Sequence, residues 1–163
     1  MKRFPVIFVI VLASVWFINP AYSSDLEKFR TISEIGTLAN TQDYTQALDK
    51  CLDALEKYPQ EPELYYWSAV IKSRLGYNPE AVLDFDKAIE LNPDNSSLYV
   101  MRGISKSELG NNTGALEDFD QALKVNPNDG SAYSMRACVK VEMGDLQGAN
   151  EDLEMMNNIY REK

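Results

Sequence analysis

The sequence predicts an all-α protein, an α-solenoid of about eight antiparallel helices. The first observation behind this prediction is a period of 34 residues, over which the same residue types return in register. The second is that each period contains two apolar runs at helical spacing, and in most periods glycine breaks the first run and proline ends the second. One helix pair cannot bury its apolar face alone, but stacked pairs can. The columns of the repeat are Tyr65, Tyr99 and Tyr133; Gly76, Gly110 and Gly144; Pro59, Pro93 and Pro127; and Ala47, Ala81, Ala115 and Ala149.

Residues 1–23 are predicted to be a secretory signal peptide rather than part of this fold. The basic pair Lys2-Arg3 is followed by apolar residues 6–18, and the small residues Ala21 and Ser23 are spaced for cleavage. The apolar stretch of about 13 residues is short for a membrane-spanning helix, which needs about 20. We therefore expect cleavage after Ser23 and an exported protein, either periplasmic in a bacterium or secreted. An uncleaved N-terminal anchor is the alternative.

Residues 24–163 are predicted to form one domain of four repeats, each with two helices. Counted back from the prolines, the repeats are 28–61, 62–95, 96–129 and 130–163. Ser24-Asp25-Leu26-Glu27 has the form of a capping box, so we expect the first helix to begin close to Ser24. Asn78-Pro79 predicts a capped helix start with proline in the first turn. In the third repeat, Gly110 ends the first helix and Asn126-Pro127 ends the second.

These columns resemble the tetratricopeptide repeat (TPR) family. In the third repeat, the family's order of aromatic, small, Gly, Ala, Phe, Ala and Pro is carried by Tyr99, Gly103, Gly110, Ala115, Phe119, Ala122 and Pro127. The first repeat departs from the pattern, with Thr31 in place of the aromatic residue and Gln42 in place of the glycine. The last repeat departs at Leu153 and Met156. The resemblance implies a right-handed superhelix in which the first helix of each repeat lines a concave groove for a partner peptide or helix.

Carried over position by position, the resemblance places an apolar and aromatic set of side chains on this groove. Methionine suits adaptable binding surfaces, and Trp and Tyr are typical anchors. The partner is therefore expected to be a protein or peptide with hydrophobic side chains, although Tyr66, Trp67 and Met101 are also open to a role in packing between repeats. The predicted partner-binding residues are Tyr66, Trp67, Val70, Arg74, Val100, Met101, Ile104, Met135 and Cys138, extended by Glu108, Ser134, Val141, Phe29, Ile32, Ser33 and Gly36.

The composition disfavours several other classes of function. The chain has 25 acidic and 16 basic residues, a formal net charge of −9 and no histidine. A nucleic-acid surface needs clustered Lys and Arg, and the absence of histidine removes Ser-His-Asp catalysis and His-based zinc sites. We expect no catalysis, no cofactor and no metal. The family's clamp members bind acidic chaperone tails through Lys, Arg and Asn, which are missing from the matching positions of this sequence.

Columns of opposite charge accompany the repeat. Lys72, Lys106 and Lys140 form a basic column, and Asp84, Asp118 and Asp152 form an acidic one; Asp86, Asp120 and Glu154 form a second acidic column. We expect Lys–Asp pairs within each repeat at the solvated surface, where such pairs contribute little to stability. A ladder of carboxylates that binds cations is the alternative.

The two cysteines belong to different repeats. Cys51 lies in the first and Cys138 in the last, so several helix layers should separate them, whereas a disulfide needs Cα atoms within about 7 Å. We expect two unpaired, buried thiols. An intermolecular disulfide or a redox-active thiol is the alternative.

The C-terminal end of the stack is predicted to be polar. The column of Leu48, Val82 and Leu116 continues as Asn150, and the column of Leu55, Ile89 and Leu123 continues as Asn157. A solenoid needs such a solvated outer face, so we expect a monomeric, exported adaptor that binds a partner protein. One alternative is a self-associating structural or assembly component that forms end-to-end dimers through Met155, Met156 and Ile159. Another alternative is a carrier of a small molecule or metal.

Overall fold

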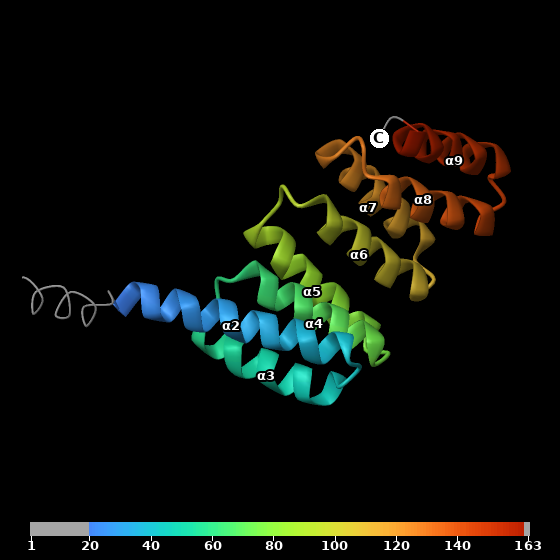
Figure 1. The fold of residues 1–163 in the computed structure, drawn as a ribbon. Helices are drawn as coiled ribbons and strands as arrows, with labels where there is room; N and C mark the ends of the chain where they lie inside the picture. Colours follow the sequence, from blue (N-terminus) through green and yellow to red (C-terminus); the bar gives the residue numbers. More distant parts are fainter. Residues whose placement is uncertain (1–19, 162–163) are drawn as a thin grey trace, which may run out of the picture.

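The computed structural model describes residues 20–161, which form eight helices and no strand (Figure 1). The helices follow one another in antiparallel pairs, from α2 and α3 at one end of the array to α8 and α9 at the other. Most of the predicted signal peptide, residues 1–19, lies outside the described residues. The helices are α2 (Pro20–Asn40), α3 (Tyr44–Lys57), α4 (Pro62–Arg74), α5 (Asn78–Leu91), α6 (Ser96–Glu108), α7 (Asn112–Val125), α8 (Gly130–Glu142) and α9 (Leu146–Arg161). The predicted all-α solenoid is confirmed.

The array curves because its two layers of helices are spaced differently. The first helix of each repeat contacts the first helix of the next repeat: α2 contacts α4, α4 contacts α6, and α6 contacts α8. Each also contacts the helices that are adjacent to it in the sequence. Within residues 20–161, no such contact joins α3, α5, α7 and α9 to one another. The first helices therefore lie close together on the inner, concave surface, and the second helices spread apart on the outer one.

Left-handed backbone at a fixed position joins the two helices of each repeat. Gly76, Gly110 and Gly144 have φ angles of 84°, 77° and 84°, a region that side chains with a Cβ rarely adopt. Gln42 takes the same position in the first repeat with a φ of 64°. Gln42 therefore keeps the same turn geometry as the glycines, at the cost of some backbone strain.

In three of the four repeats, the residue after the turn caps the second helix. Asp43, Asn111 and Asp145 each accept a hydrogen bond from the backbone N–H three residues later. The predicted cap at Asn78 is wrong, because the turn places Tyr77 at this position instead. Asn78 is the first residue of α5, and its buried Oδ1 has no hydrogen-bond partner among the described residues. The predicted helix start near Ser24 is also wrong in the full chain, since α2 already begins at Pro20.

Large and small residues alternate across the helix pairs of the core. Phe119 is buried against Gly103, and a Cβ added to Gly103 would lie 2.7 Å from the Cε1 atom of Phe119. In the first repeat the same two positions hold Ile35 and Cys51, which are both fully buried in one cluster. The total volume of each pair is thus divided differently from repeat to repeat.

A cluster of ion pairs around Asp118 lies in the third repeat, and one further pair connects it to the second repeat. The Asp118 carboxylate, only 4% exposed, accepts from Arg102 Nη2 at 2.5 Å and Lys106 Nζ at 2.9 Å. Arg102 Nη1 also reaches Asp86 of the preceding repeat at 2.6 Å. The predicted pairing of lysine and aspartate within a repeat is confirmed. Its predicted surface location is wrong for Asp118, because the arginine lies over the carboxylate and shields it from water.

The same arrangement recurs between the third and fourth repeats. Arg136 binds Asp152 of its own repeat and Asp120 of the preceding one, and Lys140 completes the cluster. Burial opposes ionisation of Asp152, but hydrogen bonds from Arg136 and Lys140 outweigh it and lower the pKa of this carboxyl. In the second repeat Ser68 takes the place of the arginine and donates to Asp84 at 2.6 Å.

The two cysteines are both unpaired, as predicted, but only one is buried. Burial raises the pKa of the Cys51 thiol to about 12, with a further contribution from the charge of Asp84. Cys138 is exposed, so the expectation that it is a core residue is wrong. Its position corresponds to Val70 and Ile104 on the inner surface.

Polar groups occupy both ends of the stack. Asn150 and Asn157 are exposed on α9, as the sequence predicts. At the other end, Glu34 on α2 accepts from both Arg30 and Lys50. No helix of the described chain is both long and apolar enough to cross a membrane.

Candidate functional site

The concave surface carries a chain of shallow hollows that form one groove. A hollow of about 350 Å³ lies over Phe29, Gly36 and Trp67 on α2 and α4. It shares Trp67 with a second hollow of about 310 Å³, which also borders Val70 and Arg74. A third hollow of about 340 Å³ shares Val70 and Arg74 and extends over Met101, Ile104 and Glu108. The groove therefore runs across the first helices of three successive repeats.

The Trp67 ring fits into the groove because Gly36, which lies opposite it, has no side chain. A Cβ on Gly36 would lie 2.9 Å from the Cζ2 atom of the indole, so glycine lets the ring lie flat against α2. The ring is half-buried against the first core cluster, and its buried Nε1 has no hydrogen-bond partner within residues 20–161. Trp67 thus packs between repeats and lines the groove with its remaining surface.

Val70 and Met101 also contribute to both packing and the groove, and Tyr66 packs beside them at the edge of a neighbouring pocket. All three pack against the buried cluster around Phe85, and the Tyr66 ring meets those of Trp67 and Phe85 edge to face. Such contacts hold aromatic side chains in one orientation. The floor of the groove is therefore fixed before a partner arrives, which reduces the entropy lost on binding.

Two predicted positions of the inner face are largely buried. Val100 is 5% exposed and belongs to the buried cluster of the third and fourth repeats, so its predicted role in partner binding is wrong. Ile32 is 7% exposed and lies in the cluster of the first repeat, but it still borders the hollow over Trp67. Both occupy the column of Tyr66, but their shorter side chains remain in the core.

The fourth repeat adds surface but no hollow to the groove. Met135 is half-buried against the neighbouring core, and Cys138 and Val141 are exposed on α8. None of them lines any of the hollows described above. The predicted residues thus fall into a hollowed section over α2, α4 and α6 and a flat apolar extension over α8.

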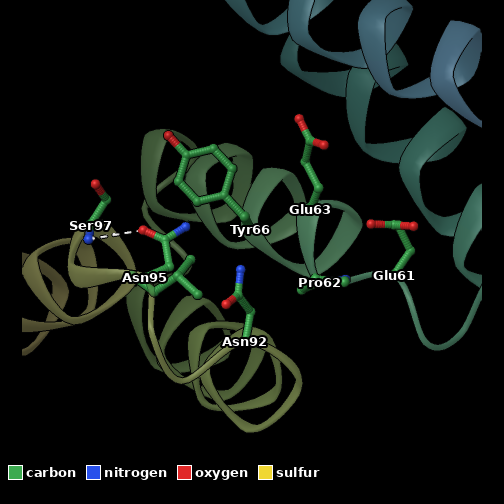
Figure 2. Close-up of a pocket in the computed structure, with 8 residues that line it drawn as sticks. Glu61, Pro62, Glu63, Tyr66, Asn92, Asn95 and Ser97 are labelled. Carbon is green, nitrogen blue, oxygen red and sulfur yellow. Dashed lines mark hydrogen bonds between the residues drawn. The ribbon is translucent and has the colours of Figure 1, made fainter. Parts of the chain in front are cut away.

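A polar pocket lies beside Tyr66, where the N-termini of α4 and α6 meet the loop after α5. It has a volume of about 350 Å³, and Figure 2 shows Tyr66 and Glu63 on α4 with Asn92 and Asn95 on the facing loop. Glu61, Pro62, Ser97 and Leu98 complete the lining. Only Tyr66 of this set is among the partner-binding residues predicted from the sequence.

The charges around the groove are mostly negative. Glu63 borders both the polar pocket and the hollow over Trp67, and Glu108 lies at the far edge beside Arg74. Glu61 accepts from Lys28 Nζ at 2.8 Å, and Glu108 accepts from Ser73 at 3.5 Å. This surface offers apolar contacts and hydrogen-bond acceptors to a ligand.

Another hollow, of about 760 Å³, lies at the N-terminal end of the described array and shares Phe29 with the hollow over Trp67. It is bordered by Leu26 and Phe29, which are 70% and 71% exposed, and by the ion pairs of Arg30, Glu34 and Lys50. Leu26 was not among the predicted site residues. Leu26 lies on α2, and within residues 20–161 no helix precedes α2 to cover it.

Comparison with known proteins gives a consistent result. Family models described as tetratricopeptide repeat match residues 62–95 and 85–117. A search of curated proteins finds no match. Solved structures match over most of the chain, and at identities between 15% and 22% these matches show the fold.

Three of these solved structures illustrate the likeness. MamA from Desulfovibrio magneticus RS-1 is 15% identical over 83% of this chain and 77% of its own, with a TM-score of 0.76. TTC0263 from Thermus thermophilus, a thermophilic TPR protein, is 22% identical over 81% and 74%, with a TM-score of 0.73. The first TPR of Spaghetti (RPAP3), bound to the HSP90 peptide SRMEEVD, is 20% identical over 72% and 93%, with a TM-score of 0.68.

Proposed function

The chain is a tetratricopeptide repeat protein, and from that premise we propose that it is a non-catalytic, exported adaptor that holds an apolar segment of a partner protein in its concave groove. The observation that carries this proposal is the continuous groove over α2, α4 and α6, with Trp67 and Met101 fixed in its floor. Rigid aromatic and methionine side chains in a shallow groove are typical anchors for a peptide or helix.

The groove chemistry favours a partner unlike the acidic peptide bound by the Spaghetti TPR. Among the described residues that line the three hollows of the groove, Glu63 and Glu108 are acidic and Arg74 is the one basic residue. A negatively charged tail would meet repulsion there rather than a cluster of cations. The bound segment is therefore apolar, and its contacts are made mainly through side chains.

Peptide selection tests this function directly. The purified chain is presented with a phage-displayed library of random 12-residue peptides, and we expect enrichment of sequences with several large apolar residues. The double variant Met101→Asn with Ile104→Asn is expected to bind the enriched peptides at least tenfold more weakly, because it removes apolar contacts in the centre of the groove. The affinities are measured by fluorescence anisotropy with labelled peptides.

A matched control separates the groove from apolar surface in general. Leu52 and Leu83 are 46% and 67% exposed on the second helices, away from the groove. The double variant Leu52→Asn with Leu83→Asn should bind within twofold of the wild type, and circular dichroism should show equal helicity for all three proteins. Equal loss of binding in both double variants would contradict the assignment of the site.

Export is the second part of the proposal and has its own prediction. Expression of the full chain in a bacterium with a Sec pathway is expected to deliver a protein that begins at Ser24 to the periplasmic fraction, since residues 1–23 have the pattern of a cleaved signal peptide. Intact-mass spectrometry of the fractionated protein measures both location and cleavage site. Recovery of uncleaved chain from the membrane fraction would favour an N-terminal anchor instead.

The adaptor is proposed to act as a monomer. The C-terminal end presents Asn150 and Asn157, where inner repeats carry apolar residues, and the N-terminal end of the described array presents the ion pairs of Glu34 with Arg30 and Lys50. Solvated ends of this kind prevent further stacking of repeats.

A further inference from the structure

Glu63 lies where the apolar groove meets the polar pocket beside Tyr66. It borders the hollow over Phe29 and Trp67 on one side and the pocket on the other. In Figure 2, the Glu63 and Tyr66 side chains rise next to each other from α4. A side chain entering the pocket from a segment bound in the groove therefore passes this carboxylate.

The charge of Glu63 is uncompensated within the described residues. Glu61, the other carboxylate of the pocket, is already paired with Lys28, whereas no ion pair involves Glu63. The pKa of the Tyr66 hydroxyl is raised first by burial and then by the negative charge of Glu63. The field of this carboxylate thus extends into the pocket.

The helix N-termini at the pocket are poorly suited to bind an anion. Pro62 at the start of α4 has no N–H, and the N–H of Ser97 is taken by the side chain of Asn95 at 3.1 Å. The N–H groups of Leu64 and Leu98 donate to carbonyl oxygens of their own helix starts. The negative carboxylate therefore determines the preference of the pocket.

Other groups of the pocket suit a positive charge on a long side chain. The Asn92 side chain faces the same space and offers an amide oxygen, and the Tyr66 ring offers a π face to a cation. A volume of about 350 Å³ accommodates the end of a lysine or arginine side chain. The apolar stem of such a residue would lie against the neighbouring groove.

On the premise of the proposed function, we propose that the bound segment is amphipathic and basic. Its apolar side chains contact Trp67, Val70 and Met101, and one lysine or arginine enters the pocket beside Tyr66 and forms an ion pair with Glu63. This assigns a recognition site for a cationic residue and makes the chain selective for basic over acidic apolar partners.

The test uses the same library of random 12-residue peptides on the wild type and on Glu63→Lys. Peptides selected by the wild type should contain at least one lysine or arginine among the apolar residues, and Glu63→Lys should select aspartate or glutamate at that place. A selected peptide whose basic residue is changed to glutamine should bind the wild type at least about tenfold more weakly, the loss expected for one charged hydrogen bond.

Glu63→Gln supplies the quantitative control. It should weaken the basic peptide by the same factor and leave the glutamine peptide unchanged, because both changes remove one interaction. Glu117→Gln, the same charge change on an exposed residue of α7, should alter neither affinity.

The outcomes distinguish this inference from the function on which it rests. Apolar peptides that lack basic residues, and that lose binding in the Met101→Asn, Ile104→Asn variant, would overturn the cation site and leave the groove in place. No enrichment at all, or peptides that bind the groove variant as well as the wild type, would overturn both.

Discussion

Replacing Asp118 by alanine is expected to lower the free energy of unfolding by about 3 kcal/mol, the typical result of removing one partner from a buried ion pair. The carboxylate is 4% exposed and holds both Arg102 and Lys106, which are themselves only 18% and 20% exposed. Without Asp118, two positive charges remain close together in a poorly solvated position. Urea unfolding followed by circular dichroism at neutral pH measures the effect.

The control for this prediction uses the same guanidinium group. Asp86 binds Arg102 from the preceding repeat at 2.6 Å, but its side chain is 50% exposed. Asp86→Ala should therefore cost less than about 1 kcal/mol, as exposed ion pairs usually do. A loss of equal size in the two variants would show that burial of Asp118 is not what makes its pairing important.

The sequence predicts the helices well because the 34-residue period records their packing. Columns such as Gly76, Gly110 and Gly144 each satisfy one geometric need, here a left-handed turn, and therefore recur. The link between repeats through Arg102 and Arg136 was missed because its column is incomplete. Ser68 occupies that column in the second repeat, so no uniform charge pattern reveals the contact.

The candidate site is less predictable because binding surfaces do not need to repeat. Family position alone brings Trp67, Val70 and Met101 to the groove, as the structure shows. The same rule fails for Val100, since a column specifies a direction on the helix and not whether the side chain is long enough to reach the surface.

The polar pocket depends on three segments that periodicity does not relate. Glu63 on α4, Asn92 after α5 and Ser97 on α6 come together only when two repeats stack. The column of Glu63 contains Phe29, Ser97 and Ser131 in the other repeats, so it has no shared chemistry. Sequence periodicity detects only residues that recur, so it gives no signal for residues that are specific to one repeat.

Replacing the small and the large residue of one core pair, Gly103 and Phe119, is expected to show strong coupling between the two helices of a repeat in the free energy of unfolding. Phe119→Cys removes a buried ring and should cost about 4 kcal/mol. Gly103→Ile places new atoms where the ring of Phe119 lies, since even a Cβ would be 2.7 Å from Cε1, and should cost about 3 kcal/mol. Either variant alone therefore removes much of the stability of a small domain.

The double variant Gly103→Ile with Phe119→Cys should lose only about 2 kcal/mol of unfolding free energy. This is well below the sum of the two single losses, because isoleucine fills the space that the ring leaves. The first repeat already uses this solution, with Ile35 and Cys51 fully buried at the same two positions. Urea unfolding of the four proteins measures the coupling. The control combines Gly103→Ile with Phe85→Cys. Its loss of unfolding free energy should equal the sum of the two single losses, because Phe85 lies in the preceding repeat and the atoms nearest to Gly103 belong to Phe119. Additive losses in the first pair as well would mean that the fit between Gly103 and Phe119 does not set the spacing of α6 and α7.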